Sequence, residues 1–186
     1  MLLQGKKAII TGGTRGIGFS VAEVFLKNGA SVALFGSRQE TVDKALAQLK
    51  SENPAWEVIG MAPDLTDYAA LDAAFSEVEN RFGRIDILVN NAGISAREPL
   101  YEYTPEAFQR IMDLNVTAAF NGCRAAAIRM KAQGGGSIIN TSSMVSLYGQ
   151  PSGVGYPTSK FAVNGMTRSL ARELGRDNIR VNAVAP

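Results

Sequence analysis

The chain has 186 residues, with 19 Lys or Arg, 17 Asp or Glu and no His, which gives a formal net charge of +2. This length is typical of one domain, and a balanced charge without charge runs argues against a nucleic-acid partner. The absence of histidine excludes a Ser-His-Asp triad, His-ligated zinc and a His general base. A single cysteine excludes an internal disulfide and a Cys-cluster metal site, so we expect no metal.

Membrane and export signals are absent from the sequence pattern. The apolar stretches are far shorter than the roughly 20 residues that span a bilayer. The charged N-terminal segment has no apolar region behind it, because Thr11-Gly12-Gly13 interrupts the run, so it does not form a signal peptide. Together with the single cysteine, this predicts a cytoplasmic protein without a membrane partner.

Short apolar runs alternate with longer amphipathic stretches along the whole chain. The predicted strands are residues 7–11, 31–35, 57–61, 85–89, 137–140 and 179–184. The predicted helices are residues 16–28, 39–51, 67–82 with Thr66 as the cap, a helix that begins at Pro105 after the cap Thr104, and residues 115–131 and 156–174.

This alternation predicts right-handed βαβ crossovers and hence an α/β fold, a Rossmann-type doubly wound parallel sheet with helices on both faces. We expect residues 1–186 to form one dinucleotide-binding domain. The chain ends where a strand reaches the carboxyl edge of the sheet, the edge at which such folds bind ligands. We therefore also expect this domain to be incomplete at its C-terminus.

A glycine-rich segment, TGGTRGIG, joins the first predicted strand to the first helix. Gly12 permits the tight turn, Gly16 lets backbone N–H groups approach an anion, and Gly18 allows close packing of helix and strand. The positive end of the helix would then face a pyrophosphate. Because the segment follows the first strand and opens a helix, we favour dinucleotide binding over a turn with only a structural role. The cofactor-binding candidates here are Gly12, Thr14, Arg15, Gly16, Ile17 and Gly18.

The end of the second predicted strand indicates the type of nicotinamide dinucleotide. An acidic residue there would bond the ribose 2′-hydroxyl of NAD, whereas an arginine can accept the 2′-phosphate of NADP. The strand ends in FGSR, with no acidic residue before Glu40. Ser37, Arg38 and, from the glycine turn, Arg15 therefore favour NADP, with NAD as the alternative. Both arginines could instead be solvated surface residues.

Two further polar segments follow the third and fourth predicted strands. Asp64, beside Leu65, could place its carboxylate against the adenine amino group, and the segment NNAG could bring backbone close to the ribose. Each could instead serve a turn, because Asn, Asp and Gly favour turns. The candidates here are Asp64, Leu65, Asn91, Ala92 and Gly93.

Tyr156 and Lys160 are four residues apart at the start of the last predicted helix and so share one face. Pro157 is expected at the first helical position, which places Tyr156 at the mouth of the sheet. A free tyrosine has a pKa of about 10, and a nearby ammonium group favours the phenolate form. Without histidine, this pair is the natural proton-transfer group, although the same spacing is common on helix surfaces.

Ser143 follows the fifth predicted strand at the same sheet edge, where its hydroxyl could bond a substrate oxygen. Ser142 is the adjacent alternative. Asn115 is expected to open a long helix at this edge, where it could hold Lys160 through a water or only cap its helix.

These motifs, in this order and spacing, resemble those of the short-chain dehydrogenase/reductase family over the whole chain. The matching residues are Thr11, Gly12, Gly16, Gly18, Asn90, Asn91, Ala92, Gly93, Asn115, Ser143, Tyr156 and Lys160. The resemblance implies an oxidoreductase that transfers a hydride between a nicotinamide and the carbonyl or secondary-alcohol carbon of a small molecule.

The resemblance also implies the role of each matching catalytic residue. Tyr156 would be the acid/base, Lys160 the cation that favours its phenolate and binds the ribose, Ser143 the donor to the substrate oxygen, and Asn115 the anchor of a proton relay. Tyr156 and Lys160 therefore count among the cofactor-binding candidates as well. A homodimer or homotetramer formed through helices 115–131 and 156–174 is implied too.

Four segments further resemble bile-acid 3α-hydroxysteroid dehydrogenases, namely residues 12–19, 45–50, 62–66 and 152–157. That subgroup carries an acidic residue at the position of Ser37 and prefers NAD, so Ser37 supports NADP here. A hydroxysteroid, a 3-oxoacyl thioester, as in 3-oxoacyl-ACP reductases, and a sugar or polyol are all candidate substrates.

The family continues beyond the position of Pro186 with a helical lid over the substrate and a final strand. This leaves a second hypothesis open, a truncated nucleotide-binding module without turnover. The full set of Asn115, Ser143, Tyr156 and Lys160 favours the enzyme, because a binding module has no need of all four.

Overall fold

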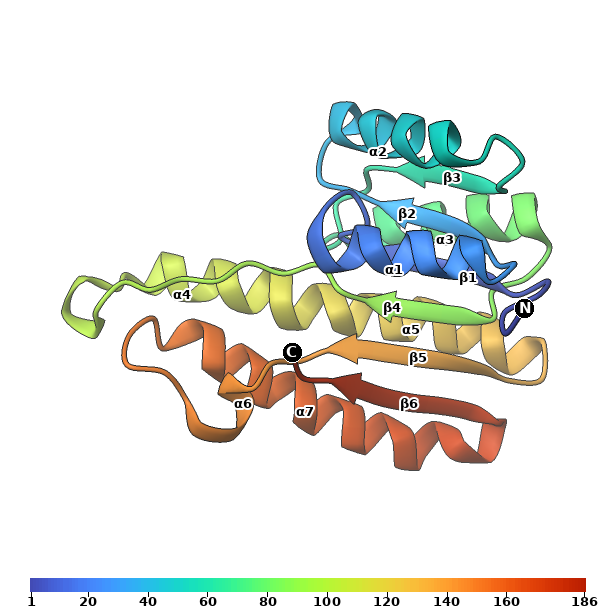
Figure 1. The fold of residues 1–186 in the computed structure, drawn as a ribbon. Coiled ribbons are helices and arrows are strands. Elements are labelled where there is room, and N and C mark those ends of the chain that lie inside the picture. The colour runs from blue at the N-terminus through green and yellow to red at the C-terminus, as the bar shows by residue number, and fades with distance from the viewer.

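The computed structural model describes residues 1–186 and contains one sheet of six parallel strands in the order β3-β2-β1-β4-β5-β6 (Figure 1). The strands are β1 (Lys7–Thr11), β2 (Ser31–Phe35), β3 (Val58–Met61), β4 (Ile87–Asn90), β5 (Gly136–Thr141) and β6 (Ile179–Val184). The α-helices are α1 (Gly16–Lys27), α2 (Gln39–Glu52), α3 (Tyr68–Phe82), α4 (Pro105–Met112), α5 (Ala118–Ala132), α6 (Val145–Tyr148) and α7 (Gly155–Leu174). The predicted Rossmann-type doubly wound sheet is thereby confirmed.

Two apolar cores lie on opposite faces of the sheet. Neighbouring residues of a strand point to opposite faces, so Ile9 and Ala33 belong to one core while Ile10 and Leu34 belong to the other. Helices α1 and α2 cover the face that carries Ile10, and α3, α5 and α7 cover the face that carries Ile9. Because both faces are covered, the central strands are apolar along nearly their whole length.

The carboxyl ends of all six strands point to the same end of the molecule, and α4 with the segment before it extends past that end (Figure 1). The chain order reverses between β1 and β4, since β2 and β3 lie on one side of β1 and β5 and β6 lie beyond β4. Ligands bind at such a switch point in doubly wound sheets. None of the helices is long and apolar enough to cross a membrane.

The cap predicted for α3 was wrong by one residue. Asp67 is the cap, because its carboxylate accepts hydrogen bonds from the backbone N–H groups of Ala69 and Ala70. Thr66 makes no such bond to the helix, and its N–H and hydroxyl both donate to Asp64 instead. The fourth strand also begins two residues later than predicted, because the N–H of Ile85 is bonded to the side chain of Gln133.

The helix predicted to open at Asn115 does not begin there. Asn115 lies inside a π-helical turn, Asp113–Thr117, which links α4 to α5 without a break. Its side chain therefore does not cap a helix. Pro157 also differs from its prediction, because α7 begins at Gly155 and Pro157 is its third residue, where a missing N–H is equally harmless. The short helix α6 had no signal in the sequence analysis.

Candidate active site

A cleft of about 710 Å³ opens at the carboxyl ends of β1 to β4. Most of the predicted cofactor residues line it: Gly12, Thr14, Arg15, Gly16, Ile17, Ser37, Asp64, Leu65, Asn91, Ala92 and Gly93. Four predicted cofactor residues do not, namely Gly18, Arg38, Tyr156 and Lys160. Sequence reasoning missed six lining residues: Phe35, Gly36, Ala62, Pro63, Ile94 and Leu114.

The glycines of the first turn have different surroundings. Gly16 has a φ of +55°, and a Cβ built on it would meet no atom within 4 Å, so open space lies above the start of α1. A Cβ on Gly18 would lie 2.2 Å from the carbonyl oxygen of Gly12, so only glycine fits there. Gly18 therefore serves packing of the turn, whereas Gly16 faces the cleft.

Asn91 and Ala92 are tied directly to the glycine turn. The backbone N–H groups of both residues donate to the hydroxyl of Thr11, at 3.0 and 3.1 Å. The Asn91 amide donates to the carbonyl oxygens of Thr11 and Gly12. These bonds fix the end of β4 against the end of β1, which holds two walls of the cleft together.

The loop after β3 forms another wall and is held from two sides. Asp64 accepts hydrogen bonds from the hydroxyl and the N–H of Thr66. These bonds, the hydroxyl bond most strongly, lower the pKa of Asp64 and keep its carboxylate ionised. From α5, the buried amide of Asn121 donates to the carbonyl oxygens of Leu65 and Thr66. The sequence gives no sign of this role of Asn121, because its hydrogen-bond partners lie more than 50 positions earlier in the chain.

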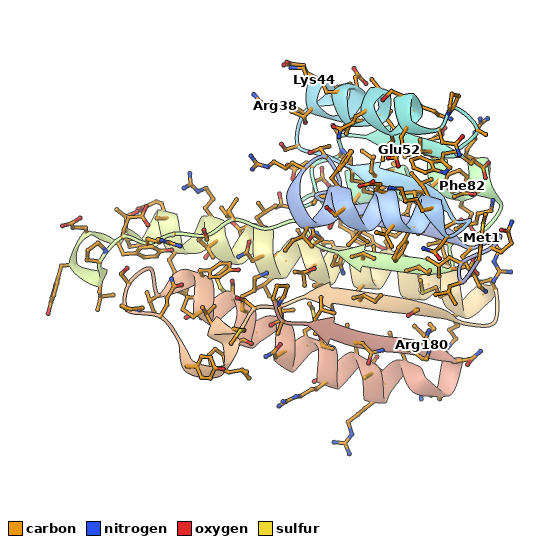
Figure 2. All side chains as sticks on the ribbon, in the orientation of Figure 1. Met1, Arg38, Lys44, Glu52, Phe82 and Arg180 are labelled. Carbon is orange, nitrogen blue, oxygen red and sulfur yellow. The ribbon has the colours of Figure 1, made fainter.

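Three groups suited to a phosphate surround the end of β2. Ser37 and Arg15 line the cleft. Arg38 is the residue before α2 and is exposed, and it projects into solvent at the end of the sheet where the strand arrows point (Figure 2). No acidic side chain lines this part of the cleft, since Asp64 is the only carboxylate among the lining residues.

Tyr156 and Lys160 lie one helical turn apart at the start of α7. The Lys160 ammonium is 5.5 Å from the centre of the Tyr156 ring and donates to the carbonyl oxygen of Thr141 at 2.8 Å. Lys160 is only 4% exposed, and this burial lowers its pKa to about 8. The amino group is therefore poised between its two protonation states at mildly alkaline pH.

Gly93 connects this pair to the cleft. A Cβ built on Gly93 would lie 3.1 Å from Oδ1 of Asn115 and 3.8 Å from Nζ of Lys160. A side chain at this position would crowd Asn115, whereas Gly93 lets the cleft that it lines lie close to both side chains. The structure thus brings Asn115, Lys160 and the predicted cofactor cleft together.

The two serines after β5 have different environments. Ser142 is buried, and its hydroxyl is bonded to the hydroxyl of Ser146 and to the carbonyl oxygen of Lys160. Ser143 is 9% exposed and makes only long contacts, 3.4 Å to the carbonyl oxygen of Pro186 and 3.5 Å from the N–H of Val145. Ser143 is therefore the serine whose hydroxyl is freer to change partners.

The strand order, the glycine turn and the cleft at the switch point define a dinucleotide-binding protein of the Rossmann type. The family model described as short chain dehydrogenase matches residues 6–186. The chain belongs to this family, whose members are NAD(P)-dependent oxidoreductases that act on hydroxyl groups of small molecules.

Individual relatives differ in their named substrates. The chain is 64% identical to a 3alpha-hydroxysteroid dehydrogenase of Mediterraneibacter gnavus, over 100% of this chain and 74% of the relative. It is 36% identical to a 3-oxoacyl-[acyl-carrier-protein] reductase of Chlamydia muridarum, with the same coverage. The crystal structure of an NAD+-bound xylitol dehydrogenase superposes with a TM-score of 0.96 at 34% identity, over 100% of this chain and 71% of that one.

Proposed function

We propose that this chain is an NADP(H)-dependent hydroxysteroid dehydrogenase, which interconverts a ring hydroxyl group and a ketone of a steroid. The observation that carries the substrate class is the identity of 64% with a 3alpha-hydroxysteroid dehydrogenase over the whole chain. Identity to the 3-oxoacyl reductases is only 36–37%. The complete set of catalytic candidates supports turnover over a binding module.

The cleft fits a dinucleotide. Its volume of about 710 Å³ is that of a small-molecule site. The open space at Gly16, in front of the N-terminal end of α1, suits a pyrophosphate. Arg15 and Ser37 would hold the adenosine side with Asp64 and Leu65, and Asn91, Ala92 and Gly93 would hold the ribose side.

The proposed proton donor and acceptor is Tyr156. When the cofactor is bound, its nicotinamide supplies the hydride for reduction or accepts it in oxidation. In reduction, the Tyr156 hydroxyl gives its proton to the substrate oxygen, and in oxidation the phenolate takes the proton from the alcohol. The Lys160 ammonium lies 5.5 Å from the centre of the Tyr156 ring, and the Ser143 hydroxyl donates to the same substrate oxygen.

The preference for NADP is proposed from charge. Arg15 and Ser37 line the adenosine end, Arg38 adjoins it, and no carboxylate faces them that could bond a 2′-hydroxyl. We expect Arg38→Glu to lower the ratio of kcat/KM for NADPH over NADH by at least about tenfold, the cost of one lost charged contact. Arg180→Glu, a reversal at the opposite end of the molecule (Figure 2), is the control. An unchanged ratio in Arg38→Glu would make Arg38 a surface residue only.

Substrate class is tested by the loss of absorbance of NADPH or NADH with three substrates. A 3-keto steroid, a 3-oxoacyl thioester and a ketose are offered under the same conditions. We expect kcat/KM to be highest for the steroid by at least about tenfold, since a fitted apolar site discriminates to this degree. Preference for the thioester would replace the steroid assignment, and cofactor binding without turnover of any substrate would favour the binding module.

A homodimer or homotetramer is also proposed, with α5 and α7 at the interface. The apolar side chains of Phe120 and Ile128 on α5 and Phe161 on α7 are each about half exposed. Light scattering measures the molar mass in solution, which should be two or four times the chain mass of 19.8 kDa. The unpaired cysteine supports a reducing, cytoplasmic location.

A further inference from the structure

Ser159 is a completely buried serine on α7, between Tyr156 and Lys160. Its hydroxyl donates to the backbone carbonyl oxygen of Tyr156 at 2.6 Å. The Oγ atom of Ser159 in turn accepts a hydrogen bond of 3.0 Å from the side-chain amide of Asn115. Ser159 therefore joins two elements that are 44 positions apart in the chain.

Asn115 continues this connection to the cleft. Its Oδ1 accepts from the backbone N–H of Ile94 at 2.8 Å, and its Nδ2 donates to the carbonyl oxygen of Ile94 at 2.8 Å. With the bond to Ser159, both N–H donors of the amide are used. Ile94 lines the cleft, so a chain of hydrogen bonds runs from the cleft wall through Asn115 and Ser159 to Tyr156.

The π turn around Asn115 makes this geometry possible. One inserted residue rotates the following part of a helix by about 100°, so it changes the direction in which a side chain points. Asn115 is the buried residue of the turn Asp113–Thr117. The turn directs the amide toward both Ile94 and Ser159, which lie on different elements.

A neighbouring residue provides the ordinary case for comparison. The hydroxyl of Thr158 also donates to a carbonyl oxygen of its own helix, that of Val154, at 2.8 Å. Such bonds are common for Ser and Thr in helices and carry no wider role. Thr158 is exposed and has no partner on another element, whereas Ser159 is buried and bonded to Asn115.

We propose that Ser159 is a positioning residue, which locks the first turn of α7 to the Asn115–Ile94 clasp and thereby fixes Tyr156 relative to the cofactor cleft. This inference rests on the proposed function for the role of Tyr156. The connection itself consists of hydrogen bonds within the chain, so it can be tested separately from catalysis.

The test compares Ser159→Ala with Thr158→Ala, its matched control. In Ser159→Ala we expect kcat for the 3-keto steroid to fall about tenfold, the effect of losing one orienting hydrogen bond at a reacting group. The Kd for NADPH, read from its fluorescence, should change less than about twofold, because the Asn115–Ile94 clasp remains. Amide hydrogen exchange of residues 154–163 should become faster, and Thr158→Ala should change none of the three.

A double-mutant cycle with Asn115→Ala shows whether Ser159 acts through Asn115. We expect the double variant to have the kcat of Asn115→Ala alone, because the connection is already broken there. If Ser159→Ala does not fold, Ser159→Cys takes its place, since it keeps the size and loses the strong hydroxyl bonds.

Unchanged kcat and unchanged exchange in Ser159→Ala would overturn the positioning role. A loss of kcat that Thr158→Ala reproduces, or an equal loss of NADPH affinity, would overturn it too. If the wild-type protein reduces no substrate, the proposed function fails while the exchange measurement still decides whether Ser159 locks α7.

Discussion

Tyr156 is the residue on which the proposed chemistry depends most. Tyr156→Phe removes the hydroxyl and keeps the ring, so proton transfer is lost while packing remains. We expect kcat to fall by at least about 100-fold, the usual contribution of a general acid or base, with little change in the Kd for NADPH. Tyr101→Phe, at a fully exposed tyrosine, is the control. Near-normal turnover in Tyr156→Phe would remove Tyr156 from its assigned role.

Lys160 makes stability depend on pH in a predictable direction. Burial lowers its pKa to about 8 from the ordinary 10.5, so between these values the unfolded chain holds a proton that the folded chain has released. The free energy of unfolding therefore rises with pH in this window and is flat, as far as Lys160 is concerned, below it.

Lys160→Met isolates this effect, because all other titrating groups stay the same. Between pH 7 and pH 9.5, the free energy of unfolding of the wild-type protein should gain about 2 kcal/mol relative to the variant. Urea titrations at the two pH values measure the difference. A difference that does not grow with pH would mean that Lys160 is not desolvated in solution.

Among single residues, the sequence singles out candidates for the chemistry by their type and gives no sign of those whose contacts are to distant partners. Tyr156 and Lys160 are four positions apart, so their proximity follows from helix geometry alone. Ser159 and Asn121 were missed because each depends on a hydrogen bond to a distant part of the chain. A buried serine or asparagine has no pattern of its own in a single sequence.

The start of α3 provides a test at the level of one element. Asp67→Ala removes an acceptor for two backbone N–H groups, so the protein should lose about 1 kcal/mol of stability. Thr66→Ala is the matched comparison, because Thr66 bonds Asp64 and not the helix. Thermal unfolding of both variants decides between the two residues, and a larger loss in Thr66→Ala would contradict the assignment of Asp67 as the cap.

The π turn marks the limit of sequence reasoning about elements. Most predicted helices and strands agree with the structure to within two residues, because apolar periodicity identifies them and glycines mark where they end. A π turn keeps the local composition of a helix and changes only its register, so residues 113–117 carry no signal for it. Asn115 was therefore wrongly predicted to begin a helix, although it lies inside a continuous helical segment.

At the scale of the molecule, the central strands are shared by both apolar cores. β1 contributes Ile9 to one core and Ile10 to the other, so loss of this strand would disrupt both cores at once. We expect one cooperative unfolding transition, as for a single domain.

One tryptophan and one cysteine in the chain can report the unfolding of the two cores separately. Trp56 packs against one core, and Cys123 is buried in the other with a pKa raised to about 12 by burial, so it should resist thiol reagents in the folded protein. In urea, the fluorescence change of Trp56 and the exposure of Cys123 to a thiol reagent should have the same midpoint. Two separate midpoints would show that the faces of the sheet unfold independently.

The parallel sheet was predictable because strands and helices alternate along the chain. The order of the strands in the sheet was not predictable from this pattern, since alternation alone allows the third and fourth strands to lie on either side of β1. That order depends on contacts between remote segments, such as the bonds of Asn91 and Ala92 to Thr11. These bonds also shape the cleft, so fold and site are specified by the same residues.

The strand order has a consequence for how the protein is made on the ribosome. β1 acquires one neighbour early, but its other neighbour is β4, and Ala8 pairs with Ile87, 79 positions later (87 − 8). At about 5–20 residues per second, the apolar edge of the nascent β1 stays open for about 4–16 s. During translation this central strand is the segment most exposed to wrong pairing, and a chaperone that shields it has those seconds in which to act.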